Sequence, residues 1–181
     1  MRSLLLSGTL LGILAGCASG SGTSDDRPVR HATVRVETNV STHELEMTVE
    51  PTALLRVVEF PAQRVWEVLP AVYADLGLRN ARADESRLTL QVNRLEVNRN
   101  LGRARLSQYL DCGTTLSMAN ADQYAVTLGA STRLVPVNEG STRIESVVTA
   151  TARPIDTAGG VTCLSRGVLE RRIAEEVGRR L

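Results

Sequence analysis

Residues 124–152 read YAVTLGASTRLVPVNEGSTRIESVVTATA, and this stretch decides the fold that the sequence predicts. Apolar or small side chains recur at every second position on both sides of Asn138–Ser141, which has the composition of a turn. A period of two places one side of each strand against a core. We therefore expect a long antiparallel hairpin, whose core-facing residues are Tyr124, Val126, Leu128, Ala130, Leu134, Ile144, Val148, Ala150 and Ala152.

A helix is expected upstream of this hairpin, beginning after Pro61. Proline suits the first turn of a helix, where its missing N–H removes no hydrogen bond. Gly77 suits the C′ position that ends a helix, and Pro70 predicts a kink or a break between these two ends. The apolar positions share one face and are Val65, Trp66, Leu69, Val72, Tyr73 and Leu76.

A second helix is expected at the C-terminus, from about Ser165 as its N-cap. Its apolar residues are spaced by four positions and so line one side, which can pack against a sheet or another helix. They are Leu169, Ile173, Val177 and Leu181.

Shorter strands complete the pattern. The alternating segments 32–36 and 45–49 predict half-buried strands, and 53–60, apolar on both faces, predicts a central strand. Apolar positions in 88–97 change phase near Asn93, which predicts a β-bulge or a strand end there. The resulting order β-β-β-α-β-β-β-α predicts an α+β fold, an antiparallel β-sheet with two helices packed on one face.

The composition excludes several classes of protein. The chain has 181 residues, a formal net charge of +1 and only 3% aromatic residues, so it lacks the charge and the stacking surface of a nucleic-acid-binding protein. All 21 basic residues are arginine, which excludes a Schiff base and a Walker-type phosphate loop. The histidines His31 and His43 belong to no catalytic or metal-binding motif. We therefore expect no enzymatic activity, no metal and no cofactor.

The N-terminus has the form of an export signal. Arg2 precedes an apolar run over 4–14, which is shorter than the roughly 20 residues that cross a membrane. The run ends in LAGC at residues 14–17, which resembles the lipobox of bacterial lipoproteins. The resemblance implies a signal peptide over 1–16, cleavage before Cys17 and a lipid on the Cys17 thiol. An ordinary signal peptide followed by an unrelated cysteine is the alternative.

The lipobox resemblance also implies a location. Ala18 and Ser19 follow Cys17, in place of the aspartate that tends to retain Gram-negative lipoproteins in the inner membrane. The protein is therefore expected at the periplasmic face of the outer membrane, held by its lipid. Residues 17–31 predict a flexible linker that carries the lipidated cysteine, and 32–181 predict a single α+β domain.

If Cys17 is acylated, Cys112 and Cys163 remain as a pair. An exported protein occupies an oxidising compartment, so a disulfide between them is the default expectation. Metal binding by these two cysteines and a catalytic thiol are the alternatives. The first would need further ligands close in sequence, and the second would need a free cysteine beside a base.

An arginine-rich stretch is the candidate binding site for an anion. Residues 93–105 read NRLEVNRNLGRAR and contain one acid, Glu96. Guanidinium groups bind phosphates and carboxylates through paired hydrogen bonds, so the stretch could bind an anionic ligand or a lipid headgroup. A solvated strand edge and loop is the favoured interpretation, and anion binding is the alternative. The arginines concerned are Arg94, Arg99, Arg103 and Arg105.

The stretch PAQRVWEVL at residues 61–69 resembles the start of START-like and polyketide-cyclase-like helix-grip domains. The region 53–181 also resembles the C-terminal domains of BamC lipoproteins, which share this α+β layout. The START-like resemblance implies an apolar cavity under the long helix, and the BamC-like one implies a protein-binding surface. The residues expected to line such a cavity are Trp66, Leu69, Tyr73, Tyr124 and Leu169.

Two further motifs resemble those of uncharacterised bacterial lipoproteins. They are YLDCG at residues 109–113 and CxSxGxLE at residues 163–170. Arg166 departs from the small residue expected at its position in the second motif.

Three functional hypotheses follow. The first is a lipid-anchored binding or scaffolding module of the cell envelope, with an envelope protein as its partner. The second is a carrier of a small apolar ligand. A carrier needs an open cavity, whereas a binding or scaffolding module has a filled core. The third is an envelope hydrolase, which needs a histidine or a pair of acids converging in a cleft.

Overall fold

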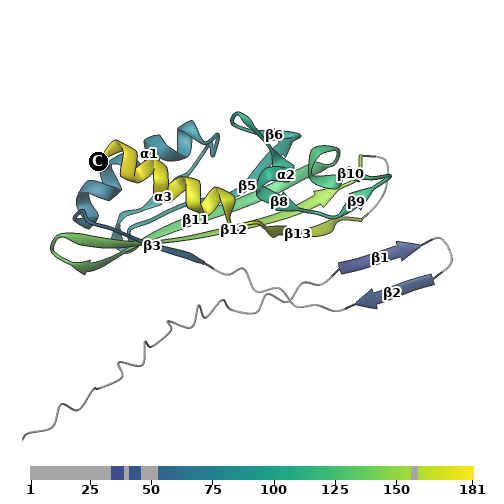
Figure 1. Ribbon diagram of the computed structural model, residues 1–181, viewed down its shortest axis with the longest axis horizontal. Coiled ribbons are helices and arrows are strands. Elements are labelled where there is room, and N and C mark those ends of the chain that lie inside the picture. The colour runs from purple at the N-terminus through teal and green to yellow at the C-terminus, as the bar shows by residue number, and fades with distance from the viewer. Residues whose placement is uncertain (1–33, 39–40, 46–52, 156–158) are drawn as a thin grey trace, which may run out of the picture.

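The computed structural model describes residues 34–38, 41–45, 53–155 and 159–181. The predicted signal peptide, Cys17 and the linker over 17–31 lie outside these residues. The main element is a seven-stranded sheet with helices against it (Figure 1), which confirms the predicted α+β class with an antiparallel sheet.

The strands of this sheet lie in the order β4-β5-β11-β12-β13-β8, and β3 also pairs with β12. All of these pairs are antiparallel. The strands are β3 (Leu54–Val58), β4 (Arg82–Asp84), β5 (Thr89–Asn98), β8 (Leu110–Asp111), β11 (Ala125–Asn138), β12 (Ser141–Arg153) and β13 (Val161–Ser165).

The predicted hairpin is formed by β11 and β12, which pair from their outer ends to the turn at Asn138 and Ser141. The alternation of apolar side chains in the sequence corresponds to burial in the structure. Tyr124 lies just before β11 and is half-buried. The other predicted core-facing residues are at most 6% exposed, and these are Val126, Leu128, Ala130, Leu134, Ile144, Val148, Ala150 and Ala152.

The change of phase in β5 is a β-bulge, as the sequence predicted. On β11 a single residue separates Leu128 from Ala130, whereas Asn93 and Arg94 both lie between the partners of these residues on β5. The extra residue turns the following apolar side chains back toward the core.

Strand β3 lies at an edge of the sheet, so the prediction of a central strand was wrong. It pairs with residues 142–146 of β12, and β13 pairs further along the same edge of β12, at residues 150–152. The side chains of Leu55 and Val57 are 56% and 55% exposed. An apolar run on both faces predicts that both faces are covered, but one face of β3 has no cover within the described part of the chain.

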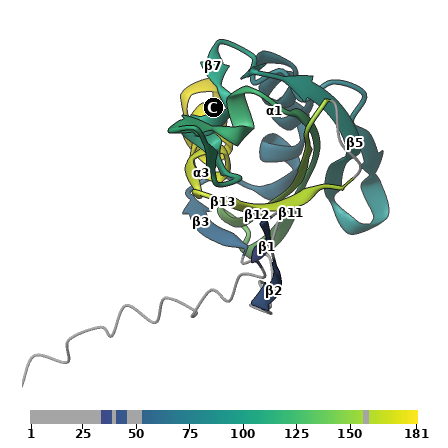
Figure 2. The same ribbon diagram turned by 90° about the vertical axis from the view of Figure 1, so that its right-hand side faces the viewer.

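Helices α1 (Ala62–Asp75) and α3 (Val168–Arg180) contact each other and β12. Figure 2 views the long hairpin end-on and shows the sheet curving around both helices. Within the described ranges, no helix is long and apolar enough to cross a membrane. The predicted apolar faces are buried at 0% exposure at Val65, Leu69, Val72, Tyr73, Leu169, Ile173 and Val177.

Helix α1 begins after Pro61, as predicted, and continues through Pro70 as one helix, so it is not broken there. It ends in a Schellman motif, in which the N–H of Leu78 donates to the carbonyl of Tyr73. Gly77 takes the left-handed φ of +82° that this motif needs.

The same glycine allows a close approach between two segments. A Cβ on Gly77 would lie 2.7 Å from the backbone nitrogen of Gly102, in the turn of the hairpin formed by β6 (Asn100–Leu101) and β7 (Ala104–Arg105). Real Cβ atoms do not come so close to backbone, so glycine at 77 lets this hairpin pack on the end of α1.

Helix α3 begins at Val168, later than predicted, and Gly167 occupies the N-cap position. Ser165 is the last residue of β13 and not the N-cap. Its hydroxyl still organises the entry to the helix, because it accepts the N–H of Gly167 at 3.1 Å and donates to Glu170 Oε1 at 2.6 Å.

The N-terminal strands form a separate two-stranded sheet of β1 (Val34–Thr38) and β2 (Ser41–Leu45). Strand β1 overlaps the predicted segment 32–36, whereas β2 precedes nearly all of the predicted segment 45–49. The remaining short elements were not predicted from the sequence. They are η1 (Glu85–Arg87), β6 (Asn100–Leu101), β7 (Ala104–Arg105), α2 (Leu106–Tyr109), β9 (Thr114–Thr115), β10 (Met118–Ala119) and η2 (Asn120–Asp122).

Candidate functional site

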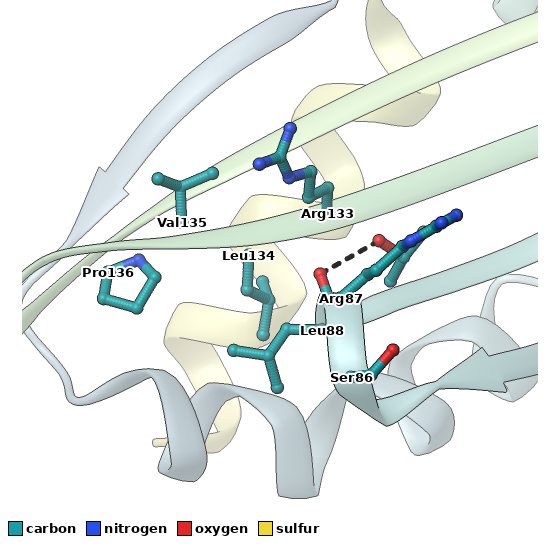
Figure 3. Close-up of a pocket in the computed structure, with 8 residues that line it drawn as sticks. Ser86, Arg87, Leu88, Arg133, Leu134, Val135 and Pro136 are labelled. Atoms are coloured by element: carbon teal, nitrogen blue, oxygen red, sulfur yellow. Dashed lines mark hydrogen bonds between the residues drawn. The ribbon is translucent and has the colours of Figure 1, made fainter.

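An open hollow of about 520 Å³ lies where the turn between β4 and β5 meets β11 (Figure 3). Its volume is within the range of small-ligand pockets. The hollow was not predicted from the sequence, because its residues come from two segments that only the fold brings together. The lining residues are Ser86, Arg87, Leu88, Thr89, Arg133, Leu134, Val135 and Pro136.

Asp84 shapes the turn that forms one side of the hollow. Its carboxylate accepts hydrogen bonds from the Ser86 hydroxyl at 2.6 Å and from the Arg87 N–H at 3.2 Å. The Ser86 bond is the main reason why the pKa of Asp84 lies below its usual value, and Arg87 adds to the effect. These bonds favour the ionised form of the Asp84 carboxylate.

The turn ends in a residue with an unusual backbone conformation. Leu88 has a φ of +48°, and the left-handed region costs a residue with a side chain on the order of 1–2 kcal/mol. The carbonyl of Leu88 accepts the N–H of Leu134 at 2.9 Å, which holds the turn against β11. Strain of this kind gathers at binding sites more often than elsewhere.

Two guanidinium groups stand at the rim of the hollow. The Arg87 side chain is 80% exposed and lies 3.8 Å from the Asp84 carboxylate, and Arg133 is exposed. Figure 3 shows both side chains extending away from Leu88 and Leu134, which approach each other and form an apolar floor. Guanidinium groups at the edge of the hollow suit a ligand with an anionic group.

The residues predicted to line a cavity do not line this hollow. Leu69, Tyr73 and Leu169 are fully buried members of the hydrophobic core. Trp66 and Tyr124 are half-buried and pack against that core. The structure therefore places these side chains in or beside one packed core.

Tyr73 carries a polar group into the core. Its hydroxyl donates to the Leu90 carbonyl at 3.1 Å and lies 2.8 Å from Thr132 Oγ1, which is 2.9 Å from Ser146 Oγ. Burial raises the pKa of Tyr73 to about 12, against an opposing effect of the Thr132 hydrogen bond. This buried network joins α1 to both strands of the long hairpin.

The four predicted anion-binding arginines are all exposed. Arg99, Arg103 and Arg105 belong to the β6–β7 hairpin or its entry, whereas Arg94 lies at the bulge of β5. Arg105 lies 3.9 Å from Asp122. Three of the four are thus grouped on one hairpin, and anion binding there stays a prediction.

The predicted disulfide is present between Cys112 and Cys163. It lies in a junction where the motifs YLDCG at 109–113 and CxSxGxLE at 163–170 meet, since β8 pairs with β13. Arg166, which departs from the expected motif, strengthens this junction. The backbone N–H of Arg166 donates to the Tyr109 carbonyl at 2.8 Å, and the Arg166 guanidinium lies 3.4 Å from the Asp111 carboxylate.

A cation–π contact completes the junction. The guanidinium of Arg172 donates to the Tyr109 hydroxyl at 2.7 Å, and its central carbon lies 5.4 Å from the centre of the ring. Tyr109 itself is 1% exposed. These contacts fix the first half of α3 to the YLDCG motif, so Tyr109 has a structural role.

A hydrolase with a Ser-His-acid triad would need His31 or His43. His31 lies outside the described residues, and His43 lies in β2. Among the residues that the structure describes, no group of three or more His, Cys, Asp or Glu side chains is placed to hold a metal ion.

No protein-family model matches this chain. No curated protein matches it either. Among solved structures, the chain is similar to a TBP-like protein from Parabacteroides distasonis ATCC 8503, with 12% sequence identity and a TM-score of 0.34. The match covers 66% of this chain and 69% of that chain.

Proposed function

We propose that the protein is a lipid-anchored lipoprotein of the cell envelope, whose body is a non-catalytic binding or scaffolding module. The observation that carries this proposal is the sequence LAGC at residues 14–17, directly after an apolar run of leader length. An acylated Cys17 holds the body beside a membrane. Ala18 and Ser19, which follow it, favour the periplasmic face of the outer membrane.

The disulfide supports export to the envelope. Cys112 and Cys163 are 51 residues apart in sequence and are joined in the folded body. Structural disulfides persist in oxidising compartments and are rare in the cytosol. The pairing also leaves Cys17 as the remaining cysteine, which is the one that the lipobox assigns to the lipid.

The packing of the body supports a module over a carrier. The curved sheet around α1 and the long C-terminal α3 is helix-grip-like, and in a carrier of this kind the space under the long helix is open. Here Leu69, Tyr73 and Leu169 occupy that region at 0% exposure. We therefore assign binding to the surface, and the hollow beside Arg87 and Arg133 is the surface that best suits an anionic group of an envelope protein.

Lipidation is tested by labelling cells that express the full chain with radioactive palmitate. We expect the wild-type chain to incorporate the label and to fractionate with membranes. Cys17→Ser should incorporate none and should keep the mobility of the uncut precursor, because the peptidase that acts on lipoproteins needs the cysteine.

The matched control is the double variant Cys112→Ser with Cys163→Ser, which keeps the lipobox and should be labelled like the wild type. A labelled Cys17→Ser chain would show that the lipid is elsewhere. An unlabelled wild-type chain would end the lipoprotein proposal.

Binding at the hollow is tested by placing a photo-crosslinking amino acid at Val135 in envelope preparations. We expect an adduct of defined mass that is at least fivefold weaker in the Arg87→Glu, Arg133→Glu background, because both changes reverse the charge at the rim. The same probe at Gly178 on α3, where an added Cβ would have no neighbouring atom within 4 Å, is the control. Equal yields at both positions, or no effect of charge reversal, would contradict the assignment.

A further inference from the structure

The β9–β10 hairpin has an apolar tip that belongs neither to the hydrophobic core nor to the proposed binding site. Residues 113–120 read GTTLSMAN and contain no charged residue. Strand β9 pairs with β10 through Thr115 and Met118, so Leu116 and Ser117 form a two-residue turn. Leu116 is 88% exposed and Met118 is 53% exposed.

The turn holds these residues against their backbone preference. Leu116 and Ser117 have φ of +49° and +65°. A two-residue turn with positive φ at both central positions favours Asn-Gly, because most side chains disfavour the left-handed region. A leucine at the tip is therefore suited neither to the turn nor to water.

The base of this hairpin is firmly attached to the body. The side-chain amide of Asn120, which is 7% exposed, donates to the Cys112 carbonyl at 3.0 Å, and Cys112 is in the disulfide. The hydroxyls of Thr115 and Tyr124 lie 3.0 Å apart. A rigid base thus projects an apolar tip away from the folded body.

A further apolar residue lies at the same end of the molecule. Ile155 is 80% exposed and lies two residues after Arg153. Arg153 pairs with Ala125, which follows Tyr124, and the Tyr124 hydroxyl contacts Thr115 of β9. Arg153 is itself exposed. This end therefore combines protruding aliphatic side chains with a cation, which suits the interface of an anionic bilayer.

The shape of the tip favours a lipid surface over a protein partner. A stable protein interface buries about 800 Å² on each partner, and a few side chains on a convex turn present far less. A bilayer needs no matching pocket, because an aliphatic side chain enters the acyl boundary without shape complementarity. The anchor that we propose at Cys17 would also bring this tip close to a bilayer.

We infer that the β9–β10 turn inserts Leu116 and Met118 into the phospholipid surface to which the chain is anchored. This inference rests on the proposed function and adds an orientation to it. Figure 1 places β9 and β10 at the opposite end of the long hairpin from the β11–β12 turn. The hollow is lined by residues 133–136 of β11, near that turn. Insertion therefore directs the hollow away from the membrane.

The test uses the full chain with Cys17→Ser, in which Ser117→Cys supplies the single free thiol for an environment-sensitive fluorophore. An N-terminal hexahistidine tag holds it on vesicles of phosphatidylcholine, phosphatidylglycerol and a nickel-chelating lipid. We expect a blue shift and at least a threefold quenching by lipid-attached nitroxide. The same fluorophore at Glu139→Cys, in the opposite turn, should behave as in water.

Adding Leu116→Asp to the Ser117→Cys chain should abolish the quenching, whereas Val137→Asp, at an apolar position that is 52% exposed near the other turn, should leave it unchanged. A Ser117 probe that remains in water, or equal quenching at both turns, would overturn the inference. Because the tag replaces the lipid, this result is independent of palmitate labelling, so failure of insertion and failure of lipidation are told apart.

Discussion

Two exposed turns of the body, those of the β11–β12 and β9–β10 hairpins, differ in how their conformations are maintained. In the β11–β12 turn, the side chain of Asn138 accepts the N–H of Gly140 at 2.8 Å, so local chemistry stabilises the reversal. In the β9–β10 turn, Leu116 and Ser117 occupy the left-handed region, which costs on the order of 1–2 kcal/mol per residue. The first turn follows from its own residues, whereas the second is maintained by contacts at its base.

The largest effect is expected from removing the disulfide that supports the base of the β9–β10 hairpin. Replacing both cysteines, Cys112→Ser with Cys163→Ser, opens a loop of 51 residues and should lower the free energy of unfolding by about 4 kcal/mol. Denaturant titration measures the loss. Relative to the wild type, hydrogen exchange should accelerate more at residues 113–120 than in the turn at 138–141.

Cys17→Ser is the control for this change, because it removes a thiol without touching the disulfide. Equal acceleration of exchange in both turns would show that the disulfide stabilises the body as a whole and does not specifically support the β9–β10 hairpin.

A smaller effect is expected at the centre of the long hairpin. Tyr73→Phe leaves the buried hydroxyl of Thr132 without one of its partners and should cost about 1–2 kcal/mol. It should also change the pH dependence of stability. The pKa of Tyr73 is raised to about 12 from its usual value of 10.0, so the folded state favours the neutral phenol. This contribution is complete below pH 10 and falls as the pH rises toward 12.

Denaturant titrations between pH 8 and 11 check this prediction. The wild type should lose stability above pH 10 more steeply than Tyr73→Phe, and exchange in 113–120 should remain unchanged at neutral pH. Parallel pH profiles for the two proteins would contradict the assignment to Tyr73.

The smallest expected effect is a gain. Leu116→Asn with Ser117→Gly introduces the pair that the β9–β10 turn geometry favours and should stabilise the protein by about 1 kcal/mol. That corresponds to a rise of roughly 2–4 °C in Tm for a domain of this size. The same variant should lose insertion into vesicles, because its tip is polar. A Tm that is unchanged or lower would show that the turn is not strained.

Much of the fold was predictable where local pattern and tertiary environment agree. The alternation along 124–152 predicted the long hairpin, and the change of phase at Asn93 predicted the bulge in β5. Pro61 and Gly77 marked the ends of α1 correctly, because their backbone preferences act whatever packs around them.

The errors arise where a neighbour overrides the local signal. The apolar run of β3 carries no information on which strands will flank it, and the structure leaves Leu55 and Val57 exposed at an edge. Ser165 is a good N-cap by type, but pairing with β8 keeps it in β13. The hollow at Arg87 and Arg133 was missed because its two segments are far apart in sequence.

The amino-acid order alone determined the backbone elements whose residues carry strong intrinsic preferences, together with the cysteines available for pairing. Those properties depend on a residue and its near neighbours, so they can be inferred without the fold. Only the tertiary structure decided which edge of β12 receives β3, how Arg166 and Arg172 reinforce the disulfide junction, and that Leu116 stands at a projecting turn. Each of these depends on contacts between distant segments, whose free energies emerge only when the chain is packed.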